Sequence, residues 1–289
     1  MEMNKLRILI TGGAGQLAQA FKDVCRNMED VELHLLNRAQ WDIGDYAMCP
    51  EMLDQYKPHV LINTAAYTAV DRAEDDGSRA MEINCSAPAF LAECCAERGI
   101  RFIHFSTDYV FNGTKNADYT EQDEPHPLNV YGFTKLQGEV EILKANPAAL
   151  ILRVSWLYYS RGKNFVLSML SLGHKNKKLN VVNDQVSSPT YAGFLAEDCI
   201  QLLKDNLALK GIFHYSHSGT ASWCEFANEI FKLANVDSEA LPISTKEYGA
   251  RAVRPAYSKL NSTKFFENTG FAQHEWREGL EMCIRKLRP

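Results

Sequence analysis

The fold is decided by residues 5–18, which read KLRILITGGAGQLA. The apolar run before Thr11 is typical of a buried strand, and the small residues after it form a turn that leads into a helical pattern. Gly12 permits the tight turn, and Gly15 lets the backbone approach a pyrophosphate at the N-terminus of the helix. Ala18 fills the third small position, where a methyl group still allows close packing of helix on strand. The stretch predicts a dinucleotide-binding loop; the alternative is a glycine-rich turn without a ligand.

Strands and helices continue to alternate through the first half of the chain. Further strands are expected at residues 31–36, 60–62, 101–105 and 149–154, with helices near residues 50–56, 80–98 and 131–144. This order predicts an α/β fold with a Rossmann-like doubly wound parallel sheet and ligands at the carboxyl ends of its strands. We expect a dinucleotide-binding Rossmann domain over residues 1–155. Residues 156–289 are expected to form a smaller α/β substrate-binding domain, with some segments free to return to the first sheet and with helices near residues 165–172, 191–204, 222–233 and 275–285.

The composition is that of an ordinary globular protein, with 46% hydrophobic and 23% charged residues in a chain of 289. A net charge of −5 argues against nucleic acid as a partner, and the basic stretch at residues 175–178 is interpreted as a solvated loop. No apolar run is long enough to span a membrane, and the N-terminus enters a strand without a signal peptide. The eight cysteines have no metal-binding spacing and read as reduced thiols, so we expect a cytoplasmic protein.

Tyr131 and Lys135 lie four residues apart in the segment VYGFTK. On a helix both side chains share one face, so the Lys135 ammonium can lie under the Tyr131 phenol. A nearby cation lowers a tyrosine pKa, which suits a phenol that gives a proton to a carbonyl oxygen during hydride transfer. The spacing alone is weak, because such pairs also occur on solvated helix faces. Together with the glycine-rich loop it predicts reversible reduction of a ketone.

Two other strand ends carry candidate site residues. Asn63 can hold its loop by side-chain hydrogen bonds, and the small residues that follow let a cofactor lie flat against the backbone. At the end of the strand before Tyr131, the hydroxyl of Thr107 could bind the substrate carbonyl. Ser106 is the competing candidate, and spacing does not choose between them. The alternative for this segment is ordinary turn chemistry of Ser, Thr and Asp.

With these motifs the chain resembles the family of dTDP-4-dehydrorhamnose reductases, within the extended short-chain dehydrogenases/reductases. The resemblance covers essentially the whole chain and rests on seven segments: residues 11–17 (TGGAGQL), 63–71 (NTAAYTAVD), 106–111 (STDYVF), 129–135 (NVYGFTK), 153–156 (RVSW), 164–165 (NF) and 254–255 (RP). So many matches in order are specific to the family. The resemblance implies reduction of the 4-keto group of dTDP-4-dehydro-L-rhamnose to dTDP-L-rhamnose by a nicotinamide, for surface polysaccharide.

The resemblance also assigns roles by position. It makes Tyr131 the proton donor, Lys135 the residue that lowers its pKa and holds the nicotinamide ribose, and Thr107 the residue that positions the keto oxygen. It implies cofactor contacts by Gly15, Gln16 and Leu17 with the pyrophosphate, by Asp42 and Ile43 with the adenine, and by Ala65, Ala66, Tyr67 and Phe105 with the nicotinamide half. It implies substrate contacts by Thr107, Asp108 and Trp156, with Val70, Tyr109, Asn164 and Arg254 as further candidates. The Trp156 ring suits stacking on thymine or a sugar, and its alternative is a place in the core.

The expected nicotinamide follows from the residues after the second strand. A strict NAD site has an acidic residue there, which binds the ribose hydroxyls. This chain has Asn37 and Arg38 instead, and a guanidinium can bind a 2′-phosphate. We expect NADPH, with NADH also accepted; the alternative is that Arg38 is an ordinary surface charge.

A metal-bridged dimer is not expected. Some members of the resembled family dimerise through magnesium-binding glutamates, and the aligned positions hold Ala20 and Gly193 here. We predict no metal requirement, and a monomer rather than a metal-bridged dimer.

Two other functions stay open. A nucleotide-sugar dehydratase or epimerase of the same fold would keep its nicotinamide bound and oxidise the sugar first. Dehydratases typically have Asp-Glu after the threonine, whereas Tyr109 follows Asp108 here, which disfavours dehydration and leaves epimerisation open. The other function is that of a regulatory protein such as the beta subunit of methionine adenosyltransferase, against which the complete set of Thr107, Tyr131 and Lys135 argues. The residues alone do not identify the sugar.

Overall fold

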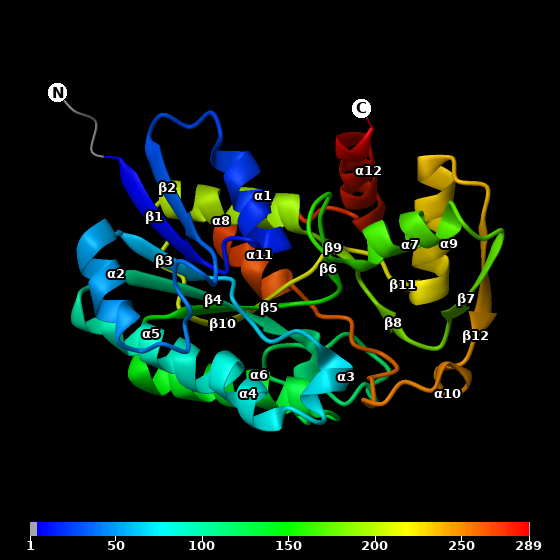
Figure 1. Ribbon diagram of the computed structural model, residues 1–289, viewed down its shortest axis with the longest axis horizontal. Helices are drawn as coiled ribbons and strands as arrows, with labels where there is room; N and C mark the ends of the chain where they lie inside the picture. The colour runs from blue at the N-terminus through cyan, green and yellow to red at the C-terminus, as the bar shows by residue number, and fades with distance from the viewer. Residues whose placement is uncertain (1–4, 289) are drawn as a thin grey trace.

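The computed structural model describes residues 5–288, and its centre is a six-stranded sheet (Figure 1). The strand order is β10-β5-β4-β3-β1-β2, and all neighbouring pairs are parallel. The strands are β1 (Leu6–Thr11), β2 (Val31–Leu36), β3 (Val60–Asn63), β4 (Arg101–Thr107), β5 (Leu150–Val154) and β10 (Gly211–Tyr215). The predicted α/β fold with a doubly wound parallel sheet is confirmed.

Helices cover both faces of the sheet because successive strand side chains point to opposite sides. In β1, Ile8 and Ile10 pack in one core and Leu9 in the other, and all three are fully buried. The first core includes α1 (Gln16–Cys25), α8 (Ala192–Lys204) and α11 (Thr263–Thr269). The second includes α2 (Met48–Tyr56), α5 (Ala87–Glu97) and α6 (Val130–Ala145). Figure 1 shows these two layers above and below the sheet.

The helix expected over residues 80–98 is divided into three parts. It consists of α4 (Gly77–Met81), a π-helical turn over Glu82–Ser86, and α5. Pro88 stands in the first turn of α5 and has no N–H to give to the carbonyl of Asn84, so a wider turn fits here. The turn directs the Asn84 side chain at the backbone of Tyr67, where it accepts from the N–H at 2.8 Å and donates to the carbonyl at 3.1 Å. This irregularity therefore fixes the loop that follows β3.

Strand β10 comes from beyond residue 155, yet it pairs with β5 over its whole length. Apart from β10, α8 and α11, the elements of this part of the chain lie beside the carboxyl ends of the main strands, on the right of Figure 1. They are the paired strands β6 (Leu157–Tyr158) and β9 (Thr190–Tyr191), β8 (Val186–Ser187) and β11 (Ala221–Ser222), and β7 (Lys178–Val182) and β12 (Glu239–Ile243), with helices α7 (Phe165–Gly173), α9 (Trp223–Ala234), α10 (Thr245–Tyr248) and α12 (Trp276–Leu287). Within residues 5–288, no helix has the length and apolar character needed to cross a membrane.

Candidate active site

The glycine-rich loop lies against the loop that follows β3. Gly12 has φ +69°, and a Cβ there would come within 2.7 Å of the backbone nitrogen of Ala65. Only glycine allows this approach, since a side chain would meet both the steric penalty of that φ and the neighbouring backbone. Gly15 caps α1 and donates its N–H to the Gly12 carbonyl at 2.8 Å. The N-terminus of α1 thus opens toward the carboxyl edge of the sheet, as an anion site requires.

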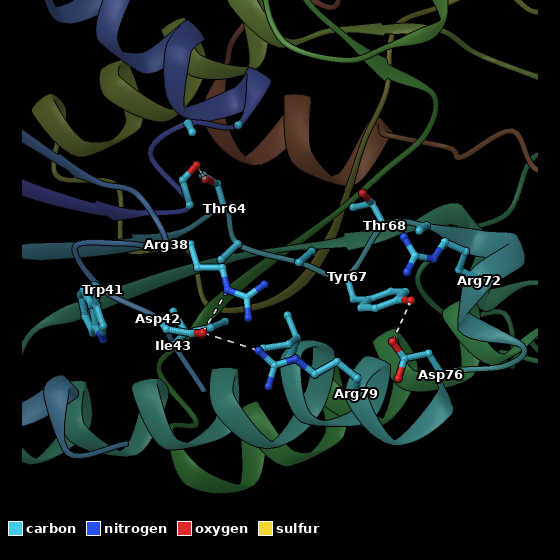
Figure 2. Close-up of a pocket in the computed structure, with 17 residues that line it drawn as sticks. Arg38, Trp41, Asp42, Ile43, Thr64, Tyr67, Thr68, Arg72, Asp76 and Arg79 are labelled. Carbon is cyan, nitrogen blue, oxygen red and sulfur yellow. Dashed lines mark hydrogen bonds and ion pairs between the residues drawn. The ribbon is translucent and has the colours of Figure 1, made fainter. Parts of the chain in front are cut away.

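Two adjoining cavities run along this edge, of about 580 and 500 Å³. They share the wall formed by Ala14, Gly15, Thr64, Ala65, Ala66 and Thr68. The first cavity, drawn in Figure 2, contains the predicted cofactor residues Gly12, Arg38, Asp42, Ile43 and Tyr67. The second contains Gln16, Leu17, Asn63, Val70, Phe105, Thr107, Asp108, Tyr109, Tyr131, Lys135 and Trp156. The predicted cofactor-binding residues and the predicted catalytic residues therefore line two cavities that adjoin each other.

Asp42 stands between two arginines in the first cavity (Figure 2). Its carboxylate accepts from Arg38 at 3.0 Å and pairs with Arg79 of α4 at 3.5 Å. Burial alone would raise the pKa of Asp42, but hydrogen bonds from the Gly44 N–H and from Arg38 outweigh it, and the pKa lies below its ordinary value. Arg79, which the sequence analysis missed, comes from a helix forty residues downstream of Arg38 and has no motif to mark it.

Tyr131 is placed in the second cavity by the start of α6. The Asn129 side chain caps this helix by accepting from the Gly132 N–H at 2.7 Å. A Cβ at Gly132 would lie 2.2 Å from the Tyr109 carbonyl oxygen, so glycine allows α6 to approach the segment after β4. Tyr109 and Tyr131 meet edge to face, with ring centroids 5.9 Å apart.

The pKa of Tyr131 is set in this structure by groups other than Lys135, and the expected effect of the lysine stays a prediction. Burial raises the pKa of Tyr131 to about 12, a hydrogen bond with Thr107 lowers it in part, and the Asp108 carboxylate raises it further. The Lys135 amine contacts groups of β4: Nζ lies 2.6 Å from the Phe105 carbonyl oxygen and 3.0 Å from His104 Nε2. Burial lowers the pKa of Lys135 to about 8, against a smaller raising effect of Glu139. The helix spacing brought both residues to one cavity, but the hydrogen bonds of the amine are with buried polar groups of β4.

Ser106 and Thr107 face different neighbours. The Ser106 hydroxyl donates to Glu139, whose carboxylate also accepts from Arg153 at 2.7 and 2.9 Å. Thr107 lowers the pKa of Tyr131, and its hydroxyl donates to Asp108 at 3.2 Å. Of the two hydroxyls left open by the sequence, Thr107 is the one beside the phenol.

Asp108 is a buried carboxyl next to these groups. Its Oδ2 accepts from Ser258 at 2.5 Å, and its exposed fraction is 2%. Burial raises its pKa to about 7, although the bonds from Ser258 and Thr107 pull it down. This carboxyl therefore holds its proton to a higher pH than an exposed aspartate does.

Trp156 and Trp223 form an aromatic wall of the second cavity. Trp156 has φ +46°, a strained conformation for a non-glycine residue, and such strain is concentrated at functional sites. Trp223 begins α9 and donates its indole N–H to Gln185 at 3.2 Å. The sequence analysis took Trp223 only as part of a helix, and its 67-residue separation from Trp156 gave no sign that the rings meet.

Two predicted substrate residues, Asn164 and Arg254, line neither cavity. The Asn164 side chain caps α7, where it accepts from the Leu167 N–H at 3.1 Å and donates to the Tyr159 carbonyl at 2.7 Å. Arg254 forms an ion pair with Asp71 at 2.8 Å, next to the segment of Val70. Both residues hold loops at the rim of the site.

The two residues aligned with metal-binding glutamates lie on neighbouring helices. Ala20 is fully buried on α1, and Gly193 is buried on α8, the helix that packs against α1. Residues 5–288 contain no cluster of three or more His, Cys, Asp or Glu side chains suited to a metal ion. The oligomeric state and the lack of a metal requirement stay predictions.

Comparison with known proteins gives the family. The profile of the family described as "RmlD substrate binding domain" matches residues 6–288. The chain belongs to this family. It is 38% identical to a dTDP-4-dehydrorhamnose reductase of Sinorhizobium fredii, over 98% of each chain, and 37% identical to the spore coat polysaccharide biosynthesis protein SpsK of Bacillus subtilis, over 97% of each. A crystal structure of dTDP-4-dehydrorhamnose reductase from Bacillus anthracis, in complex with NADP, superposes with a TM-score of 0.93 at 36% identity, over 98% of this chain and 99% of that one.

These comparisons confirm the resemblance inferred from the seven sequence segments. The predicted oxidoreductase class is the class of the relatives, and NADP is the cofactor in the Bacillus anthracis crystal structure. The residues of the glycine-rich loop fit such a group here, because Gly12, Ala14 and Gly15 line the first cavity and α1 begins directly after them at Gln16.

Proposed function

We propose that this protein reduces the 4-keto group of dTDP-4-dehydro-L-rhamnose to dTDP-L-rhamnose with NADPH, and that NADH can also serve. One observation carries the proposal: Thr107, Tyr131 and Lys135 line a single cavity that continues past the glycine-rich loop. The same cavity offers an aromatic wall for a nucleotide or sugar ring. Membership of the family supports the choice of a dTDP-sugar as the substrate.

The cofactor would be held along the hollow by backbone and by charge. Gly15 and the start of α1 would bind the pyrophosphate, and Arg38 would bind the 2′-phosphate beside the ribose. Asp42 and Ile43 would contact the adenine, while Ala65, Ala66, Tyr67 and Phe105 would surround the nicotinamide half. When bound, the reduced nicotinamide supplies a hydride to the carbonyl carbon.

The chain itself supplies the proton. Because burial raises the pKa of Tyr131, its phenol is protonated at neutral pH and can donate to the keto oxygen as negative charge develops there. Thr107 would hold the same oxygen through its hydroxyl, since it lines the same cavity as the phenol and influences its pKa. Asp108 would exchange protons with Thr107 or bind a sugar hydroxyl, and Lys135 would bind the ribose and restore the tyrosine proton.

Residues 156–289 would form the substrate-binding part, and residues 1–155 the cofactor-binding part. Trp156, Lys163 and Trp223 of the later residues line the second cavity together with the catalytic side chains. A flat indole face suits thymine or a sugar ring, and an exposed lysine suits a diphosphate. All eight cysteines are buried thiols, which supports a cytoplasmic setting. We also propose a monomer that needs no metal.

The test follows NADPH absorbance after adding dTDP-4-dehydro-L-rhamnose, generated in place by a dehydratase and an epimerase. The controls omit the protein or replace it with the Tyr131→Phe variant, whose NADPH binding is measured separately by fluorescence. We expect oxidation of NADPH to match formation of dTDP-L-rhamnose with the wild-type protein only. If the wild-type protein binds NADPH and turns over none of this substrate, the assigned sugar is wrong. If Tyr131→Phe reacts at the wild-type rate, the assigned proton donor is wrong.

A further inference from the structure

Four buried polar side chains form a chain of hydrogen bonds through the sheet to the amine of Lys135. They are Thr11 at the end of β1, Asn63 at the end of β3, His104 within β4 and Lys135 on α6. Thr11 Oγ1 lies 2.6 Å from Asn63 Oδ1, Asn63 Nδ2 lies 3.0 Å from His104 Nδ1, and His104 Nε2 lies 3.0 Å from Lys135 Nζ. None of the four is more than 1% exposed. His104 has no part in the proposed reaction, so its place in this chain needs an explanation.

The orientation of the Asn63 amide is fixed by a backbone donor. The N–H of Ala65 donates to Asn63 Oδ1 at 3.2 Å, and the Thr11 hydroxyl donates to the same oxygen. A flipped amide would set its NH2 group against the Ala65 N–H, with two donors facing each other. The Asn63 nitrogen therefore faces His104, and it can only donate.

This orientation determines the tautomer of His104. If Asn63 donates to Nδ1, that nitrogen must be the acceptor, and a neutral imidazole then carries its hydrogen on Nε2. Burial, with a smaller effect of Lys135, holds the pKa of His104 well below its ordinary value, so the ring is neutral. The Nε2–H points at Lys135 Nζ, and only an uncharged amine has a lone pair to accept it. The same amine donates to the Phe105 carbonyl at 2.6 Å, which completes its contacts without a positive charge.

We propose that His104 is a positioning residue for Lys135: in the Nε2–H tautomer imposed by Asn63, it binds the uncharged amine and holds it against the Phe105 carbonyl. In this position the lysine would lose its proton more readily than in the cavity, and the His104 contact would favour the uncharged form. The hydrogen-bond assignment stands by itself, while its meaning for catalysis rests on the proposed function. It accounts for the contacts of Lys135 with His104 and the Phe105 carbonyl.

The surroundings of Lys135 bring its uncharged form within reach just above neutral pH. The pKa of Lys135 is lowered to about 8 by burial, and Glu139 on α6 is the carboxylate that raises it. Glu139 already has a bidentate partner in Arg153 of β5, which reduces its effect on the lysine. The other ionisable groups that line the same cavity are Asp108, Tyr109, Tyr131 and Lys163. None of these is hydrogen-bonded to Lys135 among the described residues.

The test uses the full chain without added ligand and reads the two groups by nuclear magnetic resonance. Protein labelled with 15N in histidine and lysine shows which ring nitrogen of His104 carries hydrogen, and a pH titration gives the pKa of Lys135. His104→Phe removes the donor to the amine, and Asn63→Asp replaces the amide by an acceptor that favours hydrogen on Nδ1. We expect both variants to shift the Lys135 midpoint upward by about one pH unit, since a hydrogen bond to the neutral form is lost. His217→Gln is the matched control, because His217 is also fully buried and lies away from Lys135.

Two results would overturn the proposal. One is hydrogen on Nδ1 of His104 in the wild-type protein. The other is an unchanged Lys135 midpoint in both variants, with native circular dichroism showing that they fold; where His104→Phe fails to fold, the Asn63→Asp titration and the wild-type tautomer decide. Neither measurement involves turnover of a sugar, so a failed reductase assay would leave this result independent.

Discussion

Trp156 and Trp223 stack face to face, with ring centroids 3.4 Å apart and planes 7° from parallel. They come from either side of the second cavity's rim, one after β5 and one at the start of α9. The positive φ of Trp156 is an unfavourable backbone conformation, which persists only where the surrounding structure holds the residue in place. A direct stack of two indoles offers a preformed flat surface on which a planar base can stack.

Replacing Trp223 should weaken binding of the sugar nucleotide. We expect Trp223→Leu to raise KM for the substrate about tenfold, because an aromatic stack contributes roughly 0.5–1.5 kcal/mol beyond area burial, and to change kcat much less. Phe165→Leu is the control, since Phe165 touches Trp223 with centroids 4.6 Å apart but does not line the cavity. Steady-state kinetics of both variants check this. Equal KM values for the two variants would mean that the aromatic wall contributes to packing and not to substrate binding.

Substitution of Thr107 should affect catalysis, whereas substitution of Ser106 should affect the stability of the fold. We expect Thr107→Val to lower kcat by roughly 10²-fold, because a donor near the reacting oxygen is lost. Ser106→Ala should leave kcat nearly unchanged and reduce the free energy of unfolding by about 1–3 kcal/mol, since buried Glu139 loses a donor. Kinetics and urea unfolding of both variants make the comparison. The reverse pattern would assign the substrate contact to Ser106.

How much of the fold and of the site could be predicted from sequence depends on how far apart the contacting residues lie along the chain. The strands of the sheet were visible because buried parallel strands are short apolar runs, and Thr11 to Leu17 marked the cofactor end by local turn chemistry. The pair of Trp156 and Trp223, and the reach of Arg79 to Asp42, depend on tertiary contacts with no local signal. Strand β10 was not named as a strand because its run of five residues, from Gly211 to Tyr215, is short and its partner β5 lies about sixty residues earlier in the chain.

The direction of the Lys135 side chain was also beyond the sequence. Helical spacing correctly placed it in one cavity with Tyr131, but the choice of partner depends on the buried His104 ring and the Phe105 carbonyl of β4. The spacing of two residues on a helix shows that their side chains can come into contact. Whether they do depends on desolvation and on the other hydrogen-bonding groups nearby.

Gly12 should be intolerant of any side chain, for two separable reasons. Gly12→Ala puts a Cβ 2.7 Å from the Ala65 nitrogen at φ +69°, whereas Gly249→Ala has a similar φ of +65° and nothing within 4 Å. We expect Gly249→Ala to cost about 1 kcal/mol of unfolding free energy, from its backbone conformation. Gly12→Ala should cost clearly more and also weaken NADPH binding. Thermal unfolding and fluorescence titration check both variants, and equal losses in the two would refute the close contact.

Arg38 should determine the preference for the phosphorylated cofactor. We expect Arg38→Gln to raise KM for NADPH about tenfold and to leave KM for NADH nearly unchanged, since a charge-assisted hydrogen bond contributes roughly 1.5–3 kcal/mol. The same variant should lose affinity for 2′,5′-ADP but not for 5′-ADP in calorimetry. Arg26→Gln, at an exposed arginine paired with Asp23 outside both cavities, is the control. Equal effects on the two nicotinamides would instead point to Arg79, on the far side of Asp42.

Asp108 should make the protein less stable as the pH rises. Its carboxyl has a folded pKa of about 7, above the ordinary value of 3.8, so the native state holds a proton that the unfolded state has lost between these two values. The stabilisation is therefore complete below the unfolded pKa and is lost as the pH rises through the folded pKa. Asp108→Asn removes the titration, and relative to wild type it should gain up to about 4 kcal/mol between pH 4 and pH 8.

Urea unfolding of Asp108→Asn and wild type at pH 5 and pH 8 measures this difference. Asp237→Asn serves as the control, because its side chain is 89% exposed and its substitution should give the same offset at both pH values. A constant offset for Asp108→Asn as well would show that the buried carboxyl is already ionised at pH 5. In that case Ser258 and Thr107 would stabilise the charge more strongly than burial penalises it, and Asp108 could no longer act as a proton-exchanging group beside Thr107.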